Sequence, residues 1–194
     1  MRIVRACAVA LLGLMLATTA GSQTVLDTLF EKLRTATDPA AVQALEQGIW
    51  EQWTMVPEPA HRLLMLRGIA EMQQQELQAA VVSFTKLIEA APDLSEAWNK
   101  RATAHWLLGN FPASLADICE TVKREPRHFG AYSGLGMIRA QMGEHARAAA
   151  AFELARKWNP HIVGIDAEIE RQKAEAGGQV ADDPLGCGQR TAGR

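Results

Sequence analysis

Histidine and cysteine are the side chains of this 194-residue chain best suited to metal binding, and the chain has five of one and three of the other. The histidines are His61, His105, His128, His145 and His161. No two of them are four residues apart, and no cysteine or carboxylate stands beside them at a zinc-binding spacing. We therefore expect no metal site and no cofactor. His105 falls within a helical pattern and is expected to pack in a core, whereas the other four are expected to be solvated.

Two short segments resemble parts of catalytic motifs, but both motifs are incomplete. Gly134 and Gly136 begin a Gly-x-Gly-x-x-Gly phosphate loop, but Arg139 stands where the third glycine is required. Ser133 lacks the Gly-x-Ser-x-Gly frame of a hydrolase nucleophile. Paired carboxylates would need a cleft and shifted pKa values to act as acid and base, and nothing in the sequence indicates either. The sequence therefore predicts no catalytic residue and no enzyme activity.

The overall composition limits the class of protein. With 20 basic and 22 acidic residues the formal net charge is -2, which argues against a nucleic-acid partner because phosphates require a basic surface. Apolar residues make up 48% of the chain, enough to bury a core. Helix formers dominate and no segment alternates apolar and polar residues, so the fold class is expected to be all-α.

The first 22 residues are typical of a bacterial-type signal peptide. Arg2 and Arg5 precede an apolar run of 12 residues, Ala6–Ala17, and small residues follow it. Because a membrane-spanning helix needs about 20 apolar residues, this run is too short to be an anchor. We predict cleavage after Ala20 or Ser22, export to the periplasm and no stable membrane span thereafter. The alternative is an uncleaved helix at the membrane interface.

Cleavage would leave two cysteines in an oxidising compartment. Cys119 lies in a helical pattern and Cys187 lies in a glycine-rich tail. Two cysteines do not make a disulfide framework, and a tail offers nothing to hold Cys187 in place. We predict that they form no obligatory disulfide. A pair between them, or a bridge from Cys187 to another molecule, remains open.

The strongest pattern in the chain is a period of 34 residues, marked by Pro92, Pro126 and Pro160. It divides the chain into three units, 61–94, 95–128 and 129–162, here called repeats one, two and three. Matched residues stand at the fourth (Leu64, Trp98, Tyr132), eighth (Gly68, Ala102, Gly136), twentieth (Ala80, Ser114, Ala148) and twenty-fourth (Phe84, Ile118, Phe152) positions. These residues resemble the tetratricopeptide repeat (TPR) family, which implies a solenoid of antiparallel helix pairs, a TPR superhelix.

Each residue type at these positions has a physical reason. Small residues at the eighth and twentieth positions let the two helices approach, and large ones at the fourth and twenty-fourth fill the remaining space. Gly109 and Gly143 fall where the first helix ends and a left-handed residue is needed. Gln75 takes this place in repeat one. Since a non-glycine residue there costs about 1–2 kcal/mol, we expect that turn to be relaxed.

Flanking segments complete the predicted organisation. Residues 23–60 carry two apolar helical stripes, with Asp38 and Pro39 as N-cap and first helical residue, and are interpreted as a degenerate repeat. Residues 163–176 are expected to form a capping helix with Ile165 and Ile169 inward and a solvated polar face. Residues 177–194 show no periodicity and are expected to be disordered.

The resemblance also implies a concave groove lined by the first helix of each repeat. The side chains expected to bind a partner there are Met65, Ile69, Met72, Asn99, Lys100, Thr103, Trp106 and Met137. Chaperone-docking relatives hold a C-terminal carboxylate with Lys, Arg and Asn in this groove. Here Met65, Ile69, Gly130 and Gly134 occupy four of those places, so that clamp is absent.

The expected function is therefore a non-catalytic scaffold that binds a protein or peptide segment in an apolar, methionine-rich groove. By analogy with exported repeat proteins of this size, it would serve envelope assembly or cytochrome-type maturation. An alternative is a carrier or sensor of a small apolar ligand, such as a lipid or acyl chain, in the same groove. A further alternative is that the chain's own helices fill the groove.

Overall fold

A computed structural model describes residues 24–181, 183 and 185–188 of the chain. The predicted signal peptide lies outside these residues, as do positions 189–194. Among the described residues every regular element is a helix, and no strand occurs, as predicted. The chain divides into two compact units, Met1–Gln52 and Trp53–Arg194.

The N-terminal unit holds a helix pair at the place where the apolar stripes predicted it. Residues 24–35 are helical, and α2 (Pro39–Thr54) follows, its last two residues belonging to the second unit. Asp38 caps α2, because the backbone N–H of Ala41 donates to its Oδ2 at 2.8 Å. Gly48 of α2 lies against Leu29, where a Cβ would stand 3.3 Å from the leucine Cδ2. That this pair is a degenerate repeat stays a prediction.

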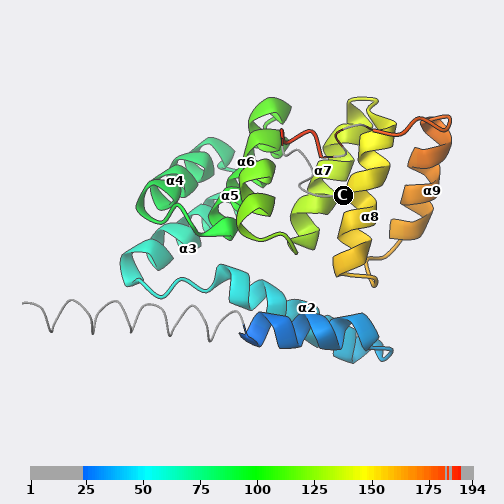
Figure 1. Cartoon of the computed structure of the whole chain (residues 1–194). Helices are drawn as coiled ribbons and strands as arrows, with labels where there is room; N and C mark the ends of the chain where they lie inside the picture. Colours follow the sequence, from blue (N-terminus) through cyan, green and yellow to red (C-terminus); the bar gives the residue numbers. More distant parts are fainter. Residues whose placement is uncertain (1–23, 182, 184, 189–194) are drawn as a thin grey trace, which may run out of the picture. The chain divides into compact units, whose positions relative to one another are not determined.

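The C-terminal unit stacks helix pairs in sequence order (Figure 1). The pairs are α3 (Pro59–Gln73) with α4 (Leu77–Ala90), α5 (Ser95–Leu107) with α6 (Phe111–Arg124), and α7 (Phe129–Gln141) with α8 (His145–Trp158). A seventh helix of this unit, α9 (Ile165–Glu175), follows α8 within the range predicted for the cap. Each pair falls in one 34-residue repeat, except that α3 begins two residues before repeat one, so the period in the sequence is the period of the fold.

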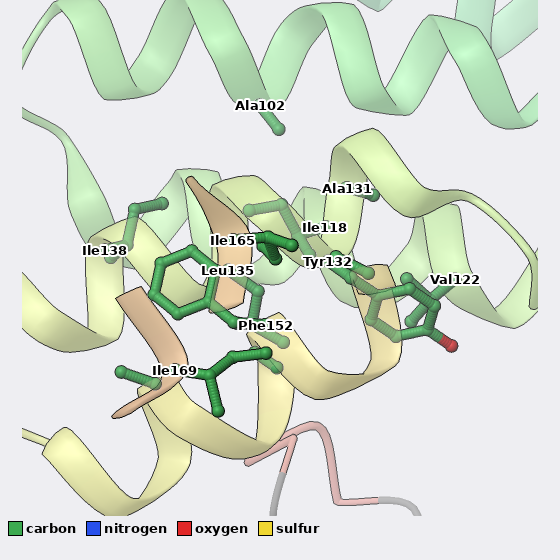
Figure 2. Close-up of a cluster of buried hydrophobic side chains, with 13 residues drawn as sticks. Ala102, Ile118, Val122, Ala131, Tyr132, Leu135, Ile138, Phe152, Ile165 and Ile169 are labelled. Carbon is green, nitrogen blue, oxygen red and sulfur yellow. The ribbon is translucent and has the colours of Figure 1, made fainter. Parts of the chain in front are cut away.

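Within repeats one and three, a glycine and a phenylalanine hold the two helices together. A Cβ built on Gly68 would stand 2.6 Å from the ring of Phe84, and one on Gly136 would stand 2.6 Å from the ring of Phe152. Repeat two has Ala102 and Ile118 at these two positions, both buried. Figure 2 shows the cluster in which Leu135 and Phe152 meet Ile165 and Ile169 of α9. The cap therefore completes the core of repeat three.

The turn inside each repeat uses one residue with positive φ. Gly109 and Gly143 have φ of 75° and 74°, as predicted, and Gln75 has φ of 63°. The expectation of a relaxed first turn is therefore wrong. The physical reason is the hydrogen bonding: the N–H of Glu76 donates to the carbonyl of Glu71 at 2.8 Å, and that of Glu144 does the same to Arg139. Only a left-handed residue before the donor allows this closure.

Two expectations about the C-terminal segment are also wrong. Cys119 of α6 and Cys187 form a disulfide, with their Cα atoms 5.5 Å apart. The segment that carries Cys187 is held on the repeats at Asp183, Leu185, Gly186 and Cys187 and is not disordered there: Arg139 of α7 donates to the carbonyl oxygens of Leu185 and Gly186, and Arg147 of α8 donates to that of Asp183. The sequence gives no sign of these contacts, because they join residues more than 30 positions apart.

Candidate binding groove

The first helices of repeats two and three enclose a small apolar hollow of about 120 Å³, here called the central hollow. Its walls come from α5, α6 and α7. The lining residues are Asn99, Ala102, Thr103, Trp106, Ser114, Ile118, Gly130, Ala131, Gly134, Met137 and Ile138. Four of the eight residues expected to bind a partner, Asn99, Thr103, Trp106 and Met137, are thus brought together.

Glycine makes the central hollow accessible. Gly130 and Gly134 stand on the lining face of α7, where side chains would otherwise fill the space. A Cβ added to Gly134 would meet only Cδ1 of Ile118, at 3.7 Å. This is ordinary contact, so Gly134 leaves open space where Gly136, two residues later, has none. The two glycines of the Gly134–Gly136 motif therefore have different roles, one at the hollow and one at the helix contact.

A larger hollow of about 670 Å³, the outer hollow, adjoins it at Met137. It lies between α7, α8 and α9 and is lined by residues that include Ser133, His145, Ile162, Glu168, Arg171 and Gln172. Met137 is 47% exposed and lines both hollows. The groove therefore runs from Trp106 across Met137 to the capping helix. The polar face of α9, expected to be solvated, therefore forms a wall of the groove that the repeat pattern does not predict.

The two hollows differ in charge. Among the described residues that line the central hollow there is no Asp, Glu, Lys, Arg or His. The outer hollow carries an ordered polar wall. Arg171 donates to Glu168, and this hydrogen bond holds the pKa of Glu168 below its ordinary value despite partial burial. The side-chain amide of Gln172 donates to Glu168 as well, and its Oε1 is hydrogen-bonded to Nδ1 of His145 at 2.8 Å. The central hollow suits an apolar group and the outer one suits a polar segment.

A buried polar cluster lies beside the central hollow. The backbone N–H of Ala131 donates to Nδ1 of His128, so the ring hydrogen sits on Nε2 and is donated to Glu96 at 2.8 Å. Burial raises the pKa of Glu96, but the hydrogen bond from His128 and the charge of Lys100 outweigh it and lower that pKa. Asn99 also donates to Glu96, at 3.0 Å. His128 is fully buried, so the expectation that it is solvated is wrong.

Several of the expected binding residues have other roles. Met65 is only 2% exposed and belongs to the buried cluster of repeat one with Phe84, which leaves it no surface for a partner. Ile69 and Met72 are half-buried and pack against the same cluster. Asn99 is 8% exposed and is bonded to Glu96, and Lys100 is paired with that carboxylate at 3.0 Å. The expectation that Met65 binds a partner is therefore wrong. Asn99 and Lys100 interact with the buried Glu96.

Other kinds of site are not evident in the described part of the chain. Its His, Cys, Asp and Glu side chains form no group of three that could hold a metal ion. No helix there is both long and apolar enough to cross a bilayer. His105 is half-buried in α5, and burial lowers the pKa of its ring.

Comparison with known proteins agrees with this architecture. The family model described as "Tetratricopeptide repeat" matches residues 65–124 and 99–161, half of the chain. The chain therefore belongs to the tetratricopeptide repeat family. A TPR repeat-containing protein of Rhizobium etli is 32% identical over 128 residues, which cover 66% of this chain and 63% of that protein. The protein SGT1 homolog of Bos taurus is 31% identical over 107 residues, 55% of this chain and 32% of that one.

Solved structures share the fold at lower identity. The first TPR of Spaghetti, bound to the HSP90 peptide SRMEEVD, superposes with a TM-score of 0.58 at 20% identity, over 60% of this chain and 93% of that one. The MamA protein superposes with a TM-score of 0.56 at 18% identity, over 82% and 85%. These likenesses support the all-helical solenoid. The chain spans less than two thirds of the curated relatives named above, so their whole activities are not transferred to it.

Proposed function

We propose that this protein is an exported, non-catalytic scaffold that binds a polypeptide segment across the central and outer hollows. The observation that carries the proposal is the uncharged central hollow, opened by Gly130 and Gly134 and flanked by Trp106 and Met137. At about 120 Å³ it has the size of one bulky apolar side chain. The outer hollow, with its ordered Glu168, Arg171 and Gln172, then takes the polar part of the same segment.

The groove chemistry selects against an acidic C-terminal peptide. The first TPR of Spaghetti is bound to a peptide that ends in Glu-Glu-Val-Asp, which is acidic. In this protein the central hollow has no cationic lining residue among the described ones, and the nearby Lys100 is paired with the buried Glu96. A carboxylate placed there would be desolvated without a partner. We therefore propose an uncharged apolar anchor in the bound segment.

The same volumes favour a peptide over a small apolar ligand. Pockets that bury a whole ligand are about 300–1,000 Å³ and mostly apolar. The central hollow is smaller than this, and the outer one, at 670 Å³, is bordered by Glu168, Arg171 and Glu175. An acyl chain would have to lie against these charges. A segment with one apolar anchor and polar neighbours fits both.

Export to the periplasm is proposed on two grounds. The first 22 residues have the charge and apolar run of a signal peptide. A disulfide between Cys119 and Cys187 is stable in oxidising compartments, which include the periplasm. A role in envelope assembly or cytochrome-type maturation would follow from this location and rests on analogy alone. N-terminal sequencing of secreted protein tests the proposed export. A chain that begins after Ala20 or Ser22 is expected, and one that begins at Met1 would contradict export.

Selection from a random peptide library tests the proposed ligand. We expect the selected peptides to share one bulky apolar residue within an uncharged stretch. In a Gly134→Leu variant the added side chain fills the central hollow and excludes the anchor residue of the peptide. Because a few anchor residues carry most of the binding energy, we expect the affinity to fall roughly tenfold or more. Ala174→Leu, on an exposed part of α9 outside the hollows, adds the same apolar side chain as a control.

Three results would contradict the proposal. Acidic C-terminal peptides among the selected sequences would indicate that the groove binds a carboxylate and not an uncharged apolar anchor. Equal affinity of wild type and Gly134→Leu would remove the central hollow from the site. A small-molecule adduct in the native mass spectrum of freshly purified protein, lost on Gly134→Leu, would favour the carrier of an apolar ligand.

A further inference from the structure

The C-terminal segment of residues 183 and 185–188, here called the strap, is bonded to three successive helices. Cys187 is joined to Cys119 of α6. Arg139 of α7 donates to the carbonyl oxygens of Leu185 and Gly186, at 3.2 and 3.4 Å. Arg147 of α8 donates to the carbonyl of Asp183 at 3.2 Å. Figure 1 shows the chain running from α9 back over the ends of α8 and α7 to α6.

The two arginines are built into this seat. Glu144, in the turn between α7 and α8, accepts from Arg139 at 2.8 Å and from Arg147 at 2.9 Å, which fixes both guanidinium groups. Arg139 is only 7% exposed. Leu185 packs against the apolar cluster that includes Leu135 and Ile169. The strap therefore contributes both hydrogen bonds and apolar contact to repeat three and its cap.

At Gly186, where the strap meets Arg139, any added side chain would force the guanidinium group out of its position. Gly186 has φ of +62°, and a Cβ there would stand 2.2 Å from Nη2 of Arg139. Gly188 has almost the same backbone angle, φ of +65°, but a Cβ on it would meet nothing within 4 Å. The two glycines share a positive φ, and only at Gly186 would an added Cβ meet the repeats. They therefore form a matched pair for experiment.

We propose that the strap is a redox-released clasp that holds repeat three and the capping helix onto repeat two. In a solenoid each repeat contacts only its neighbours, so its terminal elements open most readily. The Cys119–Cys187 bond links α6 to a point beyond α9, 68 residues away. While it is closed, α8 and α9 cannot separate from α7 without also unseating the strap. The inference requires no groove ligand, although α9 forms a wall of the outer hollow.

Release requires a dithiol reductant. Its thiolate attacks one sulfur of the Cys119–Cys187 bond and releases the other cysteine, which leaves a mixed disulfide. Its second thiolate then attacks the reductant's own sulfur in that mixed disulfide and displaces the remaining cysteine thiolate of the protein. The S–S bond of the protein breaks and one forms in the reductant. Two electrons and two protons pass to the protein, which leaves Cys119 and Cys187 as thiols. Of the contacts described for the strap, those of Arg139, Arg147 and Leu185 then remain, and water competes for the hydrogen bonds among them.

Hydrogen exchange on the full chain, oxidised and after treatment with dithiothreitol, tests this proposal. We expect reduction to speed amide exchange about tenfold or more in α8 and α9, which lie inside the bridged span, and to leave α3 and α4 unchanged. Faster exchange confined to residues 183–188, or no change anywhere, would overturn the clasp. Absence of a Cys119–Cys187 crosslink in the peptide map of protein purified under oxidising conditions would overturn it as well.

The glycine pair supplies a second readout that does not depend on unfolding. In a buffer of reduced and oxidised dithiothreitol, a seated strap favours the closed disulfide, since docking and bond formation are linked. Gly186→Ala should therefore shift the balance toward the thiols by about fivefold or more, whereas Gly188→Ala should shift it little. An equal shift in both variants would show that backbone strain alone matters and that the Arg139 seat does not. Neither result depends on whether the groove binds a peptide.

Discussion

Repeat two and repeat three each bring their two helices together with a small residue and a larger one, but the two pairs divide the volume differently. Repeat three places Gly136 against the large ring of Phe152, and repeat two places Ala102 and the smaller Ile118 at the same positions. Each pair fills the same space between two helices of nearly equal length. A smaller residue on one helix is therefore matched by a larger residue on the other.

The smaller residue of repeat two also has a consequence for the groove. Ile118 lines the central hollow and its Cδ1 lies 3.7 Å from where a Cβ on Gly134 would be. Phe152 of repeat three instead borders the outer hollow. The pair that closes each repeat therefore also shapes the hollow next to it. A substitution can therefore change stability or binding separately only at a position that touches either the helix contact or the hollow, and not both.

The variant that breaks this comparison most strongly is Gly136→Leu. Because even a Cβ would stand 2.6 Å from Phe152, a full leucine side chain should separate α7 from α8 and unfold repeat three, at a cost of about 3 kcal/mol or more. Urea denaturation measures the loss. Gly134→Ala, two residues away on the hollow side, serves as the control and should shift the midpoint slightly. Equal small shifts in both variants would mean that the repeat register is wrong.

Exchanging the two pairs sharpens the comparison. Gly136→Ala alone should cost about 1–3 kcal/mol through its clash with Phe152. Adding Phe152→Ile reproduces the pair of repeat two and should recover at least half of that cost. A double-mutant cycle from urea midpoints gives the coupling. Additive effects of the two changes would indicate that the positions do not compensate for each other.

A smaller effect is expected at the turn of repeat one. Gln75 has φ of 63° where repeats two and three have Gly109 and Gly143. Gln75→Gly should stabilise the protein by about 0.5–1 kcal/mol, the relief of a left-handed side chain less the extra freedom of glycine in the unfolded chain. Gln74→Gly, where φ is -83°, is the control and should destabilise slightly. Thermal unfolding distinguishes them, and loss of stability in both would show that Gln75 is not strained.

Much of the fold could be predicted because it follows from local spacing. Pro92, Pro126 and Pro160 gave the period, and Gly109 and Gly143 gave the turns. The central hollow was predicted in part, at Trp106, Thr103 and Met137, because positions in a repeat have fixed orientations.

The failures come from contacts between distant residues. Met65 occupies a groove position by spacing but packs with the core of repeat one, and His128 at a junction is buried by its bond to Glu96, 32 residues earlier. The Cys119–Cys187 bond depends on a strap whose seat, Arg139 and Arg147, looks like ordinary surface charge in the sequence. Periodic spacing predicts contacts within a repeat well, but it predicts contacts between residues of different repeats poorly.

We propose that the groove between repeats two and three binds an apolar anchor beside Trp106. Two tryptophans of α5 test it, since Trp106 lines the central hollow whereas Trp98 stacks with Arg124, whose guanidinium lies 4.5 Å from the ring, and donates to the carbonyl of Pro92.

The decisive measurement is the affinity for a library-selected peptide, together with the thermal midpoint, for Trp106→Ala and Trp98→Ala. We expect Trp106→Ala to weaken binding roughly tenfold or more with a small change in midpoint. We expect Trp98→Ala to lower the midpoint but to leave the affinity of the folded protein unchanged. Unchanged affinity of folded Trp106→Ala, with a collapsed midpoint, would contradict the proposal. Trp106 would then belong to the core, and the groove would not be the binding site.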